Sequence, residues 1–465
     1  MKIQRFSIYG KSILFTLAVA LFPVFQLAPF KGIGLVLSIV SILAIAASLP
    51  SCHFFTRLLS ILFLTLGTWM VESKGIDFSS YVKLYGDMLY LLSLFAIVPL
   101  LALPIQVGGY RKVFEELFQR KVKSISTLYR VVTGLSYILG SFLNMAAIPI
   151  VHSSVKSSVE ALPMKNPKRF LAIGILHGYS LPIMWTPLSG IVGVVLYVTH
   201  VRWLSIVPVL FSISLATLVM NWILFRWMEG GRPSVVGDQE TASAAEQIPL
   251  DDPPLLFRKM FQIVLAIVLL LFLIVSVDAV FSLGLVVTVT LLTVPFAWIW
   301  CLLLKRGQSF WLEVKHHFTR KVAEMSESFA IFLSAGFFVQ ALHYSGNDQL
   351  VNQLFVQCKE LIGIHLFLLL IPYMTLLLSY IGLHPIVVVH LLAQSLTPAI
   401  LGFTPEQMTI AFLGGAVMTF YMGPFSGTLG LLSSMIDVAP LRIARWSLVN
   451  VVGFSLILAA AILLV

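Results

Sequence analysis

Charged residues are scarce in this sequence. Lys, Arg, Asp and Glu together make up 11% of its 465 residues, whereas a soluble domain carries about 25%. Hydrophobic residues reach 59%, and the mean hydropathy is +0.98. Many apolar runs reach the roughly 20 residues needed to cross a bilayer. The composition therefore excludes a soluble globule and predicts an all-α polytopic membrane protein.

Cysteine is also rare, and acidic residues are outnumbered. Cys52, Cys301 and Cys358 show no metal or redox spacing, so they are interpreted as packing residues and no metal or other cofactor is expected. The net charge of +10 does not indicate nucleic acid, because Lys and Arg cluster in short loops between apolar runs. That distribution is typical of cytoplasmic loops. The expected surroundings are membrane lipid, and the expected location is the cell membrane.

Only one long hydrophilic stretch interrupts the apolar runs, at 229–258, and it is interpreted as a cytoplasmic linker between two halves. The predicted parts are a leading helix at 1–31, a first repeat at 32–228, this linker, and a second repeat at 259–465. Basic residues near the start place the N-terminus inside. Alternation of the spans then places the C-terminus outside.

One short phrase occurs twice. Thr186–Gly193 and Gly423–Gly430 share the pattern P-[LF]-S-G-x-x-G, with an offset of 237 residues from Pro187 to Pro424. Pro and Gly are costly inside an unbroken helix, and broken backbone at membrane depth must face protein or a watery cavity. Paired breaks in corresponding halves point to a secondary transporter with its site at the breaks. The alternative is a pair of kinks that only shape helix packing.

Loop charges predict two re-entrant hairpins. The stretch 126–152 has basic segments on both sides, at 106–125 and 153–169, so both flanks are expected in the cytoplasm. The apolar stretch 364–400 is the expected counterpart, entering from outside. Hairpin tip and broken phrase are equally spaced, with 45 residues from Asn144 to Ser189 and 44 from Gly382 to Ser426. The prediction is about 11 transmembrane helices in two inverted five-helix repeats, each with a re-entrant hairpin and a broken helix.

Amphipathic segments precede both hairpins. The basic stretch 110–123 is expected to lie on the inner surface, and the stretch 347–361 on the outer surface.

This arrangement resembles the ion transporter superfamily, which includes divalent anion–sodium symporters, arsenite pump relatives and sodium–proton antiporters. The resemblance covers the chain from about residue 32. In the anion symporters each hairpin tip carries Ser-Asn-Thr, which helps to bind sodium and the substrate carboxylate. Here the first tip keeps Asn144, whereas the second, Ser379–Pro385, has His384 and no Asn. The resemblance implies a transporter, a homodimer and a moving transport domain.

Hydroxyl groups at the breaks are the first candidates for binding. A break creates a helix N-terminus that suits an anion, and unwound carbonyls suit a cation. Ser189, Ser426 and Thr428 stand there, although such hydroxyls also satisfy loosened backbone. Asn144 offers donors and an acceptor in an apolar hairpin, or ties the hairpin to its neighbour. The full set of candidate binding residues is Ser141, Asn144, Thr186, Ser189, Gly190, Ser379, His384, Ser426, Gly427 and Thr428.

Histidines are the candidates for carrying a proton, because histidine changes charge near neutral pH. His384 at the second tip and His177 in the first broken span are the possible proton sites, with a hydrogen-bonded packing role as the alternative. His152 and His390 lie at or near hairpin ends and rank lower. The acidic residues Asp87 and Asp278 are expected to be solvated near the outer ends of their spans, so no carboxylate is expected deep in the membrane.

The leading functional hypothesis is a secondary active transporter for a small, carboxylate-type organic anion, driven by a proton or sodium gradient in an elevator-type movement. Efflux of an inorganic oxyanion and cation/proton antiport are alternatives. A membrane-embedded enzyme would need a convergent nucleophile–base pair or metal cluster. Such a set is not apparent in the sequence, so we expect no enzyme.

Overall fold

The computed structural model describes residues 2–28, 30–110, 113, 124–160, 164–229, 253–396 and 401–465. Every regular element in these ranges is helical. The first half contains α1 (Lys2–Leu27), α2 (Lys31–Ser48), α3 (Phe54–Glu72), α4 (Phe78–Lys83), α5 (Leu89–Ile97), η2 (Val98–Ala102), α6 (Leu103–Val107), α8 (Ile125–Leu143), η3 (Asn144–Ala146), α9 (Ala147–Glu160), α10 (Pro167–Tyr179), η4 (Pro182–Met184), α11 (Gly190–Thr199) and α12 (Trp203–Glu229). The second half contains α13 (Pro253–Phe281), α14 (Leu285–Leu303), α15 (Gly307–His316), η5 (His317–Lys321), η6 (Ala323–Met325), α16 (Ser326–Ser345), α17 (Asp348–Ile362), α18 (Ile364–Tyr380), α19 (Pro385–Ser395), α21 (Pro405–Met422), α22 (Gly427–Ile436), α23 (Pro440–Trp446) and α24 (Leu448–Leu464).

Ten helical stretches in the described residues are long and apolar enough to cross a membrane, or 11 if the bent pair α23–α24 counts as one span. This number agrees with the predicted polytopic, all-helical fold. The individual spans differ from those expected, because α11, α18 and α19 are each too short to cross a membrane alone. Breaks in the chain cause this shortening, and the same breaks define the candidate site.

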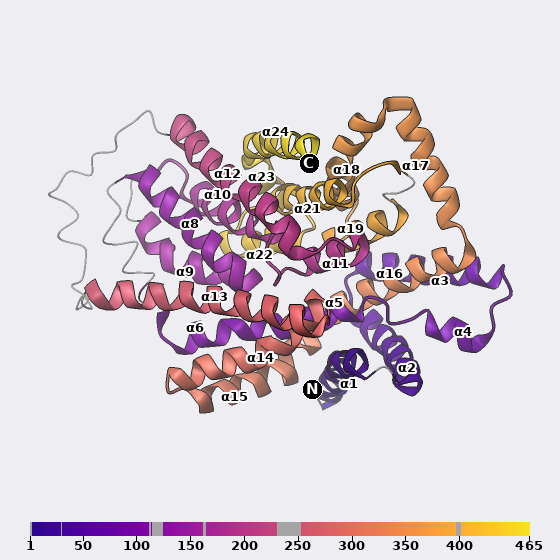
Figure 1. The fold of residues 1–465 in the computed structure, drawn as a ribbon. Helices are drawn as coiled ribbons and strands as arrows, with labels where there is room; N and C mark the ends of the chain where they lie inside the picture. Colours follow the sequence, from indigo (N-terminus) through magenta and orange to yellow (C-terminus); the bar gives the residue numbers. More distant parts are fainter. Residues whose placement is uncertain are drawn as a thin grey trace.

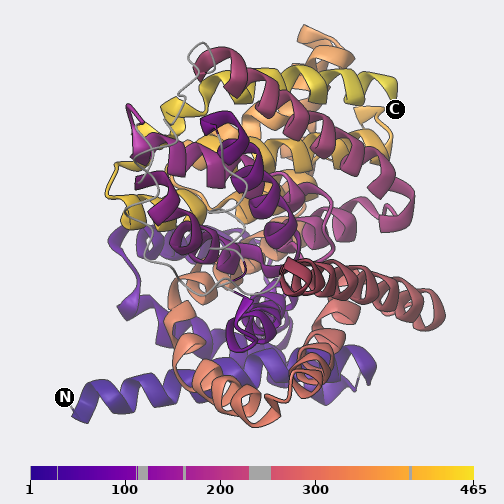
Figure 2. The same ribbon diagram turned by 90° about the vertical axis from the view of Figure 1, so that its left-hand side faces the viewer.

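The helices form two groups, which Figure 1 shows one above the other and Figure 2 shows again after a quarter turn. The lower group consists of α1 to α6 and α13 to α16, and the upper group consists of α8 to α12 and α18 to α24. The most extensive contacts stay within a group, as between α3 and α16, α8 and α10, or α18 and α21. Contacts between the groups run mainly from α5 to α11, from α16 to α19 and from η2 to α8 and η3.

The upper group is built twice from the same parts. In the first half, α8 and α9 contact each other and both pack on α10; in the second half, α18 and α19 contact each other and both pack on α21. The final helices, α12 and α24, pack against each other. The first helix pair below means α8–α9, and the second helix pair means α18–α19.

Both broken segments begin with the same local device. Asn166 accepts a hydrogen bond from the Arg169 N–H (3.0 Å) at the start of α10, and Pro167 follows at the first helical position. Thr404 accepts from the Gln407 N–H (3.1 Å) at the start of α21, again followed by a proline, Pro405. A polar cap followed by proline fixes a helix start, because proline lacks an N–H at a position that has no partner.

Two charged segments between the apolar spans also form short helices. One is α4, which Asp77 caps, and the other contains α15 and η5. Such short helices lack the long apolar periodicity by which a sequence indicates a helix. The surface helix expected at 347–361 corresponds to α17. The one expected at 110–123 and most of the linker 229–258 lie outside the described residues.

Candidate functional site

Both copies of the repeated phrase interrupt a helix at the same position. Ser189 is the N-cap of α11 and Ser426 is the N-cap of α22, each with extended backbone. Both side chains are buried, with 4% and 2% exposure. The prediction that the phrases break their helices is therefore confirmed, and each break presents the N-terminus of a ten-residue helix.

The N-termini of α11 and α22 are capped differently. Ser426 accepts a hydrogen bond from the Leu429 N–H (3.3 Å), so α22 is capped by its own serine. The Ser189 side chain makes no capping hydrogen bond to α11. Uncapped N–H groups at a helix start carry partial positive charge and favour an anion. The N-terminus of α11 at the first break therefore keeps more of its partial positive charge uncapped than the N-terminus of α22 at the second.

The first helix pair turns at Asn144, whose φ of 52° and ψ of −138° end α8 abruptly. Asn tolerates positive φ better than most residues. The Tyr179 hydroxyl donates to Asn144 Oδ1 (3.1 Å), which joins the tip to the end of α10. Thr186 Oγ1 donates to the Ser141 carbonyl (2.7 Å) and joins the same tip to the first break. The candidate residues of the first half therefore form one connected set.

The same tip also meets the second break. A Cβ placed on Gly427 would lie 3.3 Å from the Met145 Cε atom, so the start of α22 lies directly against the first tip. Thr428 is fully buried, and its hydroxyl lies beside that of Tyr179, the residue that donates to Asn144. A buried hydroxyl is favourable only when it is hydrogen-bonded. Residues from both halves thus converge around Asn144.

The second tip is held by aromatic packing. His384 caps α19, with Nδ1 accepting from the Ile386 N–H (3.3 Å), and its ring packs edge-on against Phe332 with centroids 5.2 Å apart. Phe332 in turn lies against Phe95 (5.7 Å), and Phe95 occupies the space that a Cβ on Gly190 would need. Ser379 donates to the Thr375 carbonyl within α18 (3.0 Å). His384 therefore reaches the first break through two aromatic rings of the lower group, not through a polar contact.

His177 belongs to a buried hydrogen-bond network. Its Nδ1 bonds with the Tyr129 hydroxyl (2.8 Å) and its Nε2 with Ser447 Oγ (3.1 Å). Tyr421 donates to the His177 carbonyl (3.2 Å), and Asn221 donates to Tyr421 (3.2 Å). This network ties α8, α10, α12 and α21 together. A ring with both nitrogens bonded serves to rigidify the upper group.

One polar contact was missed by the sequence reasoning. Asp87, expected to be solvated, lies 3.3 Å (Oδ2 to Nε2) from His390, which is completely buried on α19. Gln340 on α16 donates to the other carboxylate oxygen (2.9 Å). The Asp87 side chain is only 14% exposed. The sequence around Asp87 does not indicate this contact, because His390 lies in the other half of the chain.

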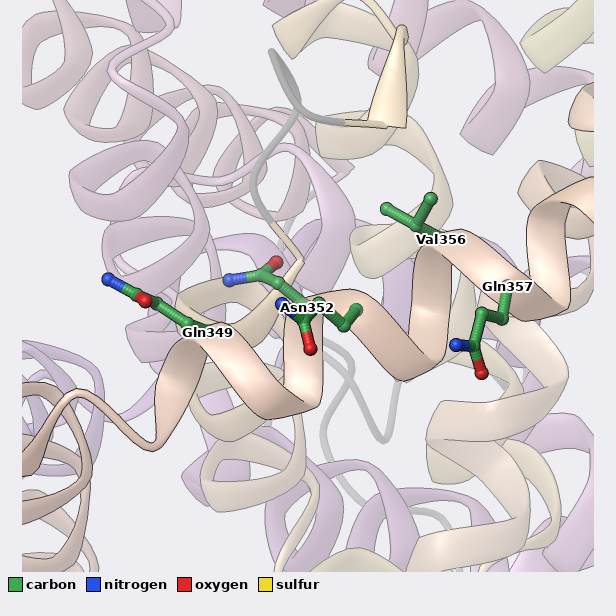
Figure 3. Close-up of a pocket in the computed structure, with 5 residues that line it drawn as sticks. Gln349, Asn352, Val356 and Gln357 are labelled. Atoms are coloured by element: carbon green, nitrogen blue, oxygen red, sulfur yellow. The ribbon is translucent and has the colours of Figure 1, made fainter.

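The two prominent cavities lie away from the breaks. One, of about 430 Å³, follows α17 and is lined by Gln349, Asn352, Gln353, Val356 and Gln357; Figure 3 shows their side chains along this helix. The other, of about 580 Å³, lies on α12 between Ser212 and Leu224. Within the described ranges, no group of three or more His, Cys, Asp or Glu side chains is positioned to bind a metal ion.

Comparison with known proteins places this arrangement among membrane transporter folds. No protein-family model and no curated protein matches the sequence. The chain is similar in structure to the YdaH transporter of Alcanivorax borkumensis, whose crystal structure revealed an unusual topology. The TM-score is 0.58 with 17% identity, over 87% of this chain and 97% of that one. This similarity shows that the chain shares the fold of that protein. It does not show the narrower resemblance to the ion transporter superfamily.

Proposed function

We propose that the protein is a secondary active transporter for a small, carboxylate-type anion, coupled to a proton or sodium gradient. The observation that carries the proposal is the convergence of the first tip with the second break, at Asn144, Tyr179 and Thr428. Two matched helix N-termini, at Ser189 and Ser426, supply partial positive charge near this point. Serine, threonine and asparagine groups can hold an anion without a basic residue.

The expected topology supports this function. The first helix pair is proposed to enter and leave from the cytoplasm and the second from outside, as inverted repeats, with the N-terminus inside and the C-terminus outside. Each tip would then reach the breaks from one side of the cell membrane. Alternating access between two such repeats is a general mechanism of secondary transporters.

The division into two groups supports an elevator-type movement. Packing is extensive within each group and sparse between them, so the upper group can move as a unit against the lower group. The lower group would then serve as the scaffold and as the interface of a homodimer. His384, at the second tip, is the proposed proton acceptor if the coupling ion is a proton.

Uptake into proteoliposomes tests the proposal. The purified protein is supplied with labelled succinate, citrate, acetate and arsenite, with sodium and proton gradients imposed separately. We expect uptake of at least one carboxylate that needs one of the two gradients. Ser189→Ala and Ser426→Ala should each reduce it, whereas Ser434→Ala should not, because Ser434 is exposed on the same helix as the second break and donates to Leu431.

Two results would contradict this function. Gradient-dependent movement of arsenite alone would favour the inorganic oxyanion. Carboxylate uptake unaffected by both break variants would remove the breaks from the binding site.

A further inference from the structure

A buried acid–base pair lies between the two helix groups, away from the breaks. Asp87 directly precedes α5 of the lower group, and His390 lies on α19 of the second helix pair. Gln340, from α16 of the lower group, holds the other carboxylate oxygen of Asp87 (2.9 Å). The pair therefore joins the part of the molecule proposed to move to the part proposed to remain fixed.

The hydrogen bonding of this pair is incomplete. Asp87 Oδ2, both ring nitrogens of His390 and the Tyr90 hydroxyl are buried, and none makes a hydrogen bond within the described residues. The 3.3 Å approach of His390 Nε2 to Asp87 Oδ2 is therefore a close contact without hydrogen-bond geometry. His177, also buried in the upper group, has both ring nitrogens bonded. Buried polar atoms without partners are rare in native structures and call for an explanation. His390 thus differs from His177, because its ring nitrogens make no hydrogen bond and can take up a proton.

The titratable groups that act on Asp87 are Tyr90 on α5 and Tyr197 on α11, besides His390 itself; the two tyrosine rings are 5.3 Å apart. The helices packed against α19 are α11, α16, α17, α18 and α21. Their other titratable side chains are Glu327, His343 and Tyr344 of α16, Asp348, Cys358, Lys359 and Glu360 of α17, His365, Tyr373 and Tyr380 of α18, and Glu406 and Tyr421 of α21. Of these, His343 and Asp348 pair with each other at 2.9 Å.

Protonation would change the strength of this contact. With neutral His390, the Asp87 carboxylate is a single negative charge facing a neutral ring across the boundary of the groups. With a proton on the ring, the two residues form an ion pair with no net charge. Opposite charges 3 to 4 Å apart in a partly buried site attract far more strongly than in water. The protonated pair would therefore hold the two groups together.

The repeat offers an internal control. His390 lies eight residues after Gly382, and His152 lies eight residues after Asn144, so the two histidines occupy equivalent places in the two helix pairs. His152 is also buried, but the charges that act on it, Lys156 and Glu160, belong to its own helix, α9. Among the described residues, a carboxylate from the lower group lies opposite this histidine in the second helix pair and not in the first.

From this geometry we infer that Asp87 and His390 form a proton-binding site that locks the second helix pair to the lower group when the proton is bound. It is a second titratable site, separate from His384, and its role in coupling rests on the proposed function.

Histidine nitrogen NMR on the intact protein in lipid nanodiscs tests this site without any substrate. The signal lost in His390→Gln identifies His390. The signal is recorded from about pH 5 to 8, where histidine ordinarily changes charge. We expect it to change form in the native protein, and to respond differently in Asp87→Asn, which removes the charge opposite the ring. His152→Gln should leave the His390 titration unchanged, and Gln340→Met should leave it closer to native than Asp87→Asn does.

A His390 signal that stays in one state across this range, or that titrates alike with and without the Asp87 carboxylate, would overturn the inference. A second measurement covers misfolding of His390→Gln: spin labels placed on α5 and α19 in the native protein should move apart as pH rises. A separation independent of pH would also overturn it. Carboxylate uptake with a non-titrating His390 rejects the proton site alone, whereas a titrating His390 without any carboxylate uptake rejects the transport function alone.

Discussion

The two helix pairs occupy equivalent positions but are fixed by different forces. The first tip is held by hydrogen bonds, from Tyr179 to Asn144 and from Thr186 to the Ser141 carbonyl. The second tip is held by aromatic packing, with His384 against Phe332. Hydrogen bonds leave lone pairs and donors that a substrate can share, whereas packed rings exclude water. We therefore expect substrate binding at the first tip and mechanical contact with the lower group at the second.

The largest expected effect is at the second tip. Phe332→Ala should lower the free energy of unfolding by about 3–5 kcal/mol, because a fully packed ring between His384 and Phe95 is replaced by a cavity. Met145→Ala at the first tip should cost much less, since Met145 is 40% exposed. Thermal unfolding of both variants in the same detergent measures the difference. Equal losses of stability in the two variants would contradict the proposed difference in packing between the tips.

At the first tip, Tyr179→Phe removes the donor to Asn144 and leaves a buried acceptor without its partner. The expected cost is about 1–3 kcal/mol of stability, with carboxylate uptake reduced by about tenfold or more. Tyr373→Phe, on the exposed side of α18, is the matched control and should change neither. Uptake that survives Tyr179→Phe undiminished would separate Asn144 from the binding site.

The equivalent glycines of the two phrases sharpen the comparison further. A Cβ on Gly193 would lie 2.6 Å from Val286 Cγ2 of α14, whereas a Cβ on Gly430 would meet nothing within 4 Å. Gly193→Ala should therefore cost about 1–3 kcal/mol through overpacking. Gly430→Ala should stabilise α22 by up to about 1 kcal/mol, because alanine favours helix. Chemical unfolding measures both variants. If Gly193→Ala were more stable than Gly430→Ala, the close contact of α11 with Val286 of α14 would be contradicted.

The smallest stability effect is expected for Thr428→Val, which keeps the shape of the side chain and removes its buried hydroxyl beside Tyr179. Stability should change by no more than about 1 kcal/mol, the net contribution of one neutral hydrogen bond. Carboxylate uptake should nevertheless fall several-fold. A large loss of uptake at nearly unchanged stability distinguishes a binding hydroxyl from a structural one, and a variant that transports normally would exclude Thr428 from the site.

The breaks were predictable from the sequence, but the contacts across the molecule were not. Proline and glycine in apolar runs act locally, and this is why the N-cap positions of Ser189 and Ser426 followed from the repeated phrase alone. The hydrogen bond from Tyr179 to Asn144 and the contact of Asp87 with His390 depend on how helices pack. An aspartate near the end of a span looks the same in the sequence whether it faces water or a buried histidine.

Cysteine labelling from the two sides of the membrane tests the inverted repeat most directly. In a background without Cys52, Cys301 and Cys358, single cysteines replace Lys156 near the end of the first helix pair, Arg57 in the first turn of α3, and Gly363 at the start of the second helix pair. The account predicts that a membrane-impermeant reagent labels Gly363→Cys from outside only, and Lys156→Cys and Arg57→Cys from inside only. Labelling of Lys156→Cys from the outside, or of Gly363→Cys from the inside, would contradict it.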